Sequence, residues 1–261
     1  MSISSPSSAE AVVLPTALRH ALQQALSEPP QRVRRLHADG QALWLKQPER
    51  LNWRWRLQKG NSKRALERER RGLHLLASTR MPVAPIVAEG ETFLATPDVG
   101  KPIKRLLRTQ SEQGVAACAA AGVALATLHG AGFSHGRPGI RDICWDGAQA
   151  TFIDLEWFSS RRHRNAHFGL DVFLFLHSIL AVKRQIGPEL YAAVAGYRQH
   201  APSEAWAAAR TWAWWLAGLG RLSVWIQTWR PDTGDVVAIP HTLQVLRNDV
   251  GRSTHYDNEG A

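Results

Sequence analysis

The sequence predicts an α+β fold in two lobes, a small lobe of strands with helical support followed by a larger, mostly helical lobe. Two observations lead to this prediction. Before residue 97, strand-like runs surround turn signals such as Asp39-Gly40. After residue 102, apolar residues recur at helical spacing, and only one short hairpin, around Asp146-Gly147, interrupts them. We expect the two lobes to join near residues 97–101.

The small lobe is predicted from apolar spacing and from its breakers. Pro29-Pro30 stops a short amphipathic helix, and Pro82 and Pro85 end a second helix. Lys46 closes the second of the strands that flank Asp39-Gly40, and the next hairpin turn is placed at Glu89-Gly90. In chain order we expect a helix at 18–26, strands at 31–36 and 42–46, a helix at 62–77, and strands at 86–88 and 92–96.

The helical lobe is predicted from long apolar or alanine-rich runs. Gly130 ends the alanine-rich run, and the segment 170–182 is almost wholly apolar, as in a buried helix. In chain order we expect helices at 102–107 and 114–129, strands at 143–145 and 150–153, and helices at 170–182, 188–199, 203–218 and 220–229.

The domain organisation follows from these elements. Residues 17–97 form the small lobe and 98–250 the helical lobe, and we expect 1–16 and 251–261 to be flexible tails. No basic region precedes an apolar run near the N-terminus, and no stretch has the ~18 uninterrupted apolar residues of a membrane span. The two cysteines are too few for a disulfide framework. These features predict a soluble, cytoplasmic protein.

The formal net charge of +10 allows nucleic acid, anionic lipid or a phosphorylated sugar as a partner. The basic residues are spread over several segments instead of forming one tract, and no nucleic-acid reading motif accompanies them. Nucleic acid is therefore disfavoured as a partner, and a solvated surface on an arginine-rich protein is the plainer interpretation.

The most informative segment begins at His135 and ends at Glu156. It resembles the catalytic loop of protein kinases and their small-molecule relatives, H-[RG]-D-x-x-x-x-N, followed by a strand that ends in Asp. His135 takes the first place, Asp142 stands at the metal-binding Asn, and Asp154 ends the strand. Arg137 stands where these enzymes carry their catalytic Asp.

Three further segments carry the same resemblance. Residues 128–136 are similar to the LHxxGxxHGD passage of the lipopolysaccharide kinase families (Kdo kinase and heptose kinase) and of aminoglycoside phosphotransferases. Residues 43–46 resemble the strand that ends in the ATP-binding Lys. Residues 68–76 with 81–85 resemble the helix and turn that supply its partner Glu. The resemblance covers roughly residues 31–185 and implies a bilobal protein-kinase-like fold.

The resemblance implies ATP and Mg²⁺ as cofactors. Lys46 would hold the α and β phosphates, and Glu69 would orient Lys46 through an ion pair. Asp142 and Asp154 would bind Mg²⁺, which prefers oxygen ligands. The expected partners are the nucleotide and an anionic saccharide or lipid-linked substrate, with a peripheral contact at the inner membrane surface.

The resemblance also implies roles for Arg137 and Asp171, and strand alternation indicates one for Glu156. Arg137 would lie beside the γ-phosphate and stabilise the transferring charge, or it would pair with a metal-binding Asp and displace the metal. Glu156 points to the same face as Asp154 and could add a ligand or accept a proton. Asp171 would anchor the backbone of the catalytic loop.

Each of these residues also has a plainer interpretation. Lys46 could be a solvated strand-edge residue, Glu69 could form a surface pair, Asp154 could cap a turn, and His135 could be a core histidine. The single glycine at Gly40 also departs from the glycine-rich loop of protein kinases. Order and spacing taken together favour the functional interpretation.

Three functions remain open from the sequence. The leading one is an ATP- and Mg²⁺-dependent phosphotransferase of the lipopolysaccharide-kinase type, acting on a sugar or a lipid-linked saccharide. The second is a pseudokinase that binds nucleotide or a partner protein without catalysis, which Arg137 favours. The third is a basic nucleic-acid-binding module.

Overall fold

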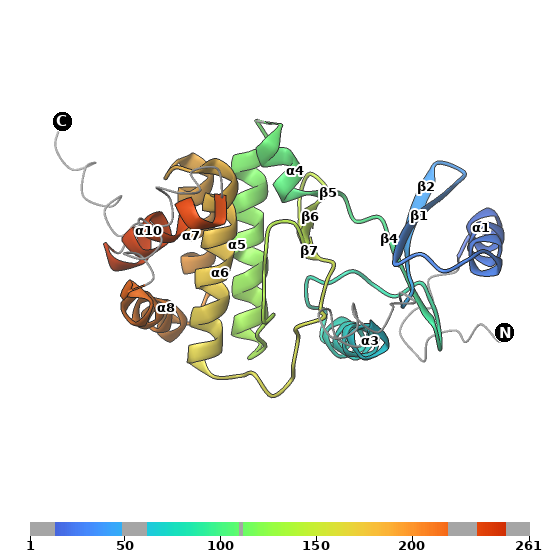
Figure 1. Cartoon of the computed structure of the whole chain (residues 1–261), viewed down its shortest axis with the longest axis horizontal. Helices are drawn as coiled ribbons and strands as arrows, with labels where there is room; N and C mark the ends of the chain where they lie inside the picture. The colour runs from blue at the N-terminus through green and yellow to red at the C-terminus, as the bar shows by residue number, and fades with distance from the viewer. Residues whose placement is uncertain (1–13, 49–61, 110–111, 219–233, 249–261) are drawn as a thin grey trace. The chain divides into compact units, whose positions relative to one another are not determined.

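The computed structural model describes residues 14–48, 62–109, 112–218 and 234–248. The expected tail 251–261, most of the expected tail 1–16 and the expected helix 220–229 lie outside these residues. The fold is α+β and divides into two compact units (Figure 1). The first unit comprises the chain up to Val99 together with Asp154–Phe158, and the second comprises Gly100–Ile153 and the chain from Ser159 onward.

The first unit contains one antiparallel sheet of four strands, in the order β1-β2-β4-β3, and two helices. Its elements are α1 (Thr16–Ser27), β1 (Val33–Ala38), β2 (Gln41–Lys46), α3 (Ser62–Ser78), β3 (Ala88–Gly90) and β4 (Phe93–Pro97). All six were predicted in type and order.

The first hairpin forms as its sequence predicts. Asp39 and Gly40 have φ angles of 51° and 73°, the left-handed pair that joins strands with the correct twist. The second hairpin differs, because β3 continues through Gly90 and pairs it with Phe93. The predicted Glu89-Gly90 turn is therefore wrong. Gly90 is required there for another reason, since a β-carbon would lie 2.3 Å from the Phe93 ring.

Helix α1 packs against β1 and β2. Its buried residues Leu18 and Leu22 join a core that includes Leu43 and Leu45 of β2. Because side chains alternate along a strand, burying Leu43 and Leu45 on this face directs Lys46 to the opposite face. The alternation of β2 therefore fixes which way the candidate lysine points.

The second unit contains a three-stranded antiparallel sheet, in the order β5-β6-β7, and six described helices. Its elements are β5 (Lys101–Pro102), α4 (Ile103–Arg108), α5 (Gly114–Gly130), β6 (Ile143–Trp145), β7 (Ala150–Phe152), α6 (Asn165–Lys183), α7 (Pro188–His200), α8 (Ser203–Trp215) and α10 (Gly234–Arg247).

Small residues allow the helices of the second unit to approach closely. A β-carbon on Gly122 of α5 would lie 2.2 Å from the Ala193 carbonyl oxygen of α7. In return, a β-carbon on Gly196 of α7 would lie 2.4 Å from the Ala119 carbonyl oxygen of α5. The alanine-rich composition of α5, which alone predicts only helix, thus also provides a flat surface for α7.

Helix α10 was not predicted, because Pro240 lies inside it and removes a backbone donor. Burial of Ala238, Leu243 and Leu246 against the second unit compensates for that loss. Helix α8 ends at Trp215, three residues before the predicted end.

Among the described residues, α6 is long and apolar enough to cross a membrane by length and composition. It also packs against α8 and α10 and holds the buried Asp171, as a core helix does. No other described helix meets the same length and hydropathy criteria.

Candidate functional site

Lys46 and Glu69 form a buried ion pair in the first unit. The Lys46 ammonium, at the end of β2, contacts the Glu69 carboxylate on α3 through a hydrogen-bonded salt bridge. The Lys46 side chain is 18% exposed and that of Glu69 is 2% exposed. The predicted pairing is therefore confirmed, and the interpretation of either residue as a solvated surface charge is wrong.

Glu69 is buried because it lies within the apolar stripe of α3. Leu66, Glu69, Leu73 and Leu76 follow one another at three- and four-residue spacing and are all buried. A carboxylate in such a stripe needs a partner, because burying an unpaired charge costs roughly several kcal/mol of folding free energy. Lys46 supplies that partner from the sheet.

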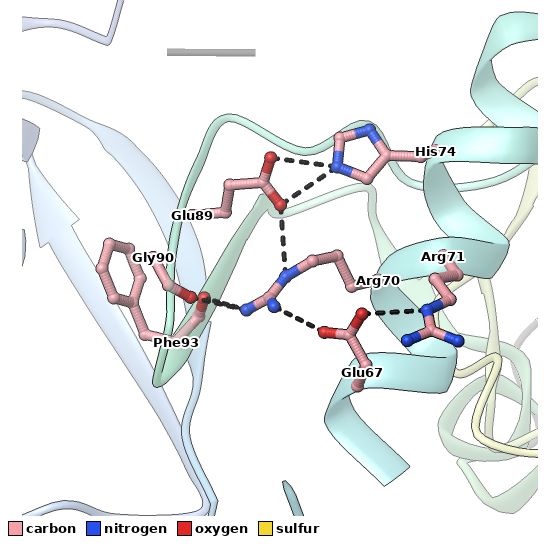
Figure 2. Close-up of polar contacts among 7 residues, drawn as sticks. All are labelled: Glu67, Arg70, Arg71, His74, Glu89, Gly90 and Phe93. Carbon is pink, nitrogen blue, oxygen red and sulfur yellow. Dashed lines mark hydrogen bonds and ion pairs between the residues drawn. The ribbon is translucent and has the colours of Figure 1, made fainter. Parts of the chain in front are cut away.

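Arg70, the residue after Glu69, fastens α3 to the β3–β4 hairpin (Figure 2). Its guanidinium donates to the carbonyl oxygens of Gly90 (2.5 Å) and Phe93 (3.3 Å). It also pairs with Glu67 at 2.7 Å and with Glu89 at 3.3 Å. Because these contacts fix the rotation of α3, they hold the neighbouring Glu69 toward β2.

The segment Asp154–Phe158 packs directly on α3. A β-carbon on Gly72 would lie 2.9 Å from Cδ1 of Phe158 and 3.3 Å from Cδ1 of Leu155. Gly72 follows Glu69 by three residues, so it lies on the same face of α3. The missing side chain at Gly72 therefore allows Asp154 to approach Glu69.

Glu69, Asp154 and Glu156 form an acidic cluster. Carboxylate oxygens of the three lie within 4.8 Å of one another. Asp154 Oδ1 accepts the backbone N–H of Glu156 at 3.0 Å, so Asp154 does cap a turn as well. Glu156 also pairs with Arg32 at 3.0 Å. Asp154 is thus held by a local backbone contact, Glu156 by Arg32, and Glu69 by Lys46.

The cluster changes the protonation of the buried pair. Burial raises the pKa of Glu69 to about 7; Lys46 opposes this rise, and Asp154 and Glu156 add to it. Burial alone would lower the pKa of Lys46, but attraction from Glu69 and Asp154 outweighs burial and raises it. Lys46 therefore stays cationic at neutral pH, while Glu69 exchanges a proton near neutrality.

The donor set of the cluster suits a hard cation such as Mg²⁺, because all three residues offer carboxylate oxygens. Of the two predicted metal ligands, Asp154 belongs to this cluster and Asp142 lies in the second unit. That Asp142 and Asp154 share one ion therefore stays a prediction. Glu69, predicted to orient Lys46 only, is an additional oxygen donor here.

In the second unit, Asp171 anchors the loop that follows α5. Its Oδ2 accepts the backbone N–H of His135 at 2.6 Å, and its Oδ1 accepts that of Gly136 at 2.9 Å. His129 lies 3.3 Å from the same carboxylate and 2.7 Å from the Tyr197 hydroxyl. This confirms the loop-anchoring role that the resemblance implied for Asp171.

Arg137 and Asp142 lie on that loop. The backbone N–H of Asp142 donates to the carbonyl oxygen of Gly139, and its carbonyl oxygen accepts the N–H of Ile153. The Asp142 carboxylate accepts a hydrogen bond from Nε of Arg141 at 3.0 Å. The backbone carbonyl of Arg137 accepts the N–H of Gly139 at 2.9 Å. Both predicted residues therefore belong to one tight turn that leads into β6.

The same turn borders a pocket of about 750 Å³ in the second unit that sequence analysis did not find. Arg137 and Asp142 line it together with residues of α4, α6 and α10. The four-residue spacing of Lys104 and Arg108 on α4, which puts both on one helix face, was a usable signal.

The fold and the first-unit site define an α+β protein with a buried lysine–glutamate pair beside two further carboxylates. No family model matches the chain. An uncharacterised protein of Haemophilus influenzae is 33% identical to it over 172 residues, which cover 64% of this chain and 71% of that protein. The chain belongs to the same family as that protein.

Proposed function

We propose that the chain is a protein-kinase-like phosphotransferase of the lipopolysaccharide-kinase type. The observation that supports this most is the buried Lys46–Glu69 ion pair with Asp154 beside it. These residues come from three distant segments, and each was expected at a nucleotide site. A lysine held this way presents a fixed positive charge, which phosphoryl transfer needs for phosphate positioning.

In this proposal Lys46 binds the α and β phosphates of ATP, and Glu69 holds Lys46 in place. Asp154 would hold Mg²⁺, with Glu156 and Asp142 as further oxygen ligands. When bound, Mg²⁺ would neutralise charge on the phosphate oxygens. Because Glu69 has a pKa of about 7, the Lys46–Glu69 ion pair is sensitive to pH near neutrality.

The loop of the second unit gives further support. Asp171 fixes the backbone of His135 and Gly136, so the next residue, Arg137, projects from a rigid turn. Arg137 would stabilise charge on the transferring phosphoryl group, and Glu156 or the phosphate itself would accept the acceptor's proton.

The proposed acceptor is a sugar or a lipid-linked saccharide with anionic groups. A net charge of +10 suits such a substrate and a peripheral contact with the inner membrane surface, from the cytoplasmic side.

The proposal is tested by thermal unfolding with ATP and Mg²⁺. Ligand at 100 times Kd should raise the midpoint of the wild type by about 5–10 °C. Lys46→Met should remove most of this shift, whereas Lys63→Met, which removes an exposed lysine on α3, should keep it. No shift in the wild type, or equal shifts in both variants, would rule out the assigned role of Lys46.

A pseudokinase is the second candidate, and one contact favours it. The Arg141 guanidinium already pairs with the Asp142 carboxylate at 3.0 Å, which competes with metal binding. Arg137, in place of a catalytic Asp, cannot accept a hydroxyl proton.

Phosphate transfer to lipopolysaccharide-core acceptors separates the two candidates. For an enzyme, Arg137→Ala should lower kcat sharply and leave nucleotide affinity within a few-fold, because a transition-state contact acts on kcat. For a pseudokinase, the wild type transfers no phosphate while still binding ATP, and Arg137→Asp creates activity by restoring a base.

A further inference from the structure

The pocket of the second unit carries a concentration of positive charge. It lies between α4, the 137–142 turn, the C-terminal half of α6 and the start of α10. Five arginine and lysine side chains line it, against two aspartates, which gives a net charge of +3 with histidine neutral. The charged lining residues are Lys104, Arg108, Arg137, Arg141, Arg184, Asp142 and Asp235.

The histidine in the wall, His177, does not add to this charge at neutral pH. Burial lowers its pKa, and the nearby Asp235 only partly opposes this. Its Nδ1 lies 3.3 Å from the Thr242 hydroxyl of α10. His177 is therefore a neutral hydrogen-bonding group in the wall.

Among the described residues, two of the cations have no acidic partner. Lys104 and Arg108 pair with no carboxylate within the ranges that the structure describes. By contrast, the neighbouring Lys183 pairs with Glu189 at 2.5 Å. Since Lys104 and Arg108 occupy one face of α4, their charges add at the pocket instead of cancelling locally.

The walls of the pocket are held in place by backbone contacts. The backbone N–H of Lys104 donates to the carbonyl oxygen of Ile140 at 2.9 Å, and the backbone N–H of Ile140 donates to the Ser178 hydroxyl at 3.1 Å. A β-carbon on Gly234 would lie 2.4 Å from the Ala181 carbonyl oxygen, so α10 begins in direct contact with α6. The elements that form the pocket are therefore held against one another by backbone contacts.

The size and chemistry of the pocket define the ligand. About 750 Å³ is the volume of a small-molecule site, more than one phosphate ion requires. No phenylalanine, tyrosine or tryptophan is among the described lining residues, and the one aromatic ring there, that of His177, is partly buried and lies against Thr242, so the pocket offers a nucleobase little surface on which to stack. We propose that it binds a small, non-aromatic polyanion, a polyol that carries at least two phosphate or carboxylate groups. The pocket shares Arg137 and Asp142 with the proposed function, but binding of the polyanion needs neither nucleotide nor phosphotransfer.

The test is isothermal titration calorimetry of the full chain at 0.15 M salt with fructose 1,6-bisphosphate as the probe. We expect saturable binding of one equivalent of fructose 1,6-bisphosphate, at least tenfold weaker binding of inorganic phosphate, and no binding of fructose. Metal-free ATP, which carries comparable charge and an aromatic base, should bind more weakly than the bisphosphate. Binding of ATP as tight as that of the bisphosphate, and weakened to the same extent by Arg108→Gln, would contradict the proposed ligand class.

Two arginines of the same helix provide a matched comparison. Arg108→Gln, in the pocket, should weaken binding of the bisphosphate about tenfold, as expected for a lost charge-assisted hydrogen bond. Arg105→Gln removes the same charge from α4 outside the pocket and should change affinity less than twofold, because Arg105 does not line the pocket and salt weakens the effect of an exposed charge. Equal weakening by both variants would mean that only net charge matters and would overturn the proposal. If Arg108→Gln does not fold, Lys104→Gln serves in its place.

Discussion

Cδ1 of Phe158 lies 2.9 Å from the position that a β-carbon on Gly72 would occupy. The contact joins α3 to a segment that follows β7, more than eighty residues later in the chain. Since it lies one turn from Glu69, it sets how closely Asp154 and Glu156 approach the Lys46–Glu69 pair.

Gly72→Ala should therefore destabilise the protein. Alanine gains about 1 kcal/mol of helix propensity over glycine, but overpacking a tight contact costs about 1–3 kcal/mol. We expect a net loss of about 1 kcal/mol in urea unfolding. Gly130→Ala is the control, because a β-carbon there meets nothing within 4 Å and should be neutral or stabilising. Equal behaviour of the two variants would show that Phe158 does not pack on Gly72.

The raised pKa of Glu69 predicts a particular pH dependence of stability. A carboxyl whose pKa rises on folding, here to about 7, stabilises the fold at pH values below its unfolded pKa, and this contribution disappears as pH rises through 7. Between pH 5 and pH 8, the free energy of unfolding of the wild type should therefore fall by on the order of 2–3 kcal/mol relative to that of Glu69→Gln. Chemical denaturation across this range measures the difference. Glu204→Gln, at an exposed glutamate of α8, controls for the loss of a surface carboxylate. A constant difference, or one that grows toward pH 8, would contradict the prediction.

Arg70 and Arg71 are adjacent and both pair with Glu67, yet their roles should differ. Arg70 is 18% exposed and donates to two backbone carbonyl oxygens of the β3–β4 hairpin, whereas Arg71 is 76% exposed. Arg70→Ala should cost about 2–4 kcal/mol, because buried acceptors lose their donor. Arg71→Ala should cost under about 1 kcal/mol. Similar losses in thermal or urea unfolding would show that Arg70 does not fasten α3.

Asp171 uses both of its carboxylate oxygens, each to accept a backbone N–H of the loop. In Asp171→Asn the amide would place an NH₂ donor against one of these N–H groups, so we expect a loss of about 2–4 kcal/mol. Asp146 accepts the N–H groups of Ala148 and Gln149 through one oxygen only and is exposed. Asp146→Asn can keep both bonds and should be nearly neutral. Hydrogen exchange at His135 and Gly136 should accelerate only in Asp171→Asn, and unchanged protection there would refute the anchoring role.

The Lys46–Glu69 pair was predicted from the resemblance, because each residue taken alone was also consistent with a solvated surface charge. The structure shows the local reason for the pair: Lys46 ends an alternating strand, and Glu69 lies in the apolar stripe of a helix. Asp171 was likewise predicted as an anchor from the resemblance, and in the structure it is a buried acidic residue on the long apolar helix α6. The strands and helices that are signalled by apolar periodicity and ended by Gly or Pro were predicted to within a few residues.

Features that depend on distant packing were not predictable in this way. Helix α10 forms despite Pro240, because tertiary burial outweighs propensity. The place of Gly90 in β3 depends on the Phe93 ring, and the basic pocket depends on the meeting of α4, α6 and α10. None of these contacts leaves a periodic signal in the sequence.

The assignment of Asp154–Phe158 to the first unit has a consequence for biosynthesis. The chain passes between the units three times, after Val99, Ile153 and Phe158. During translation, the sheet and α3 emerge from the ribosome long before the segment that covers Gly72 and supplies two of the three clustered carboxylates. Until residue 158 emerges, Glu69 has Lys46 as a partner but lacks Asp154 and Glu156, so the acidic cluster is completed only after more than half of the protein has been made.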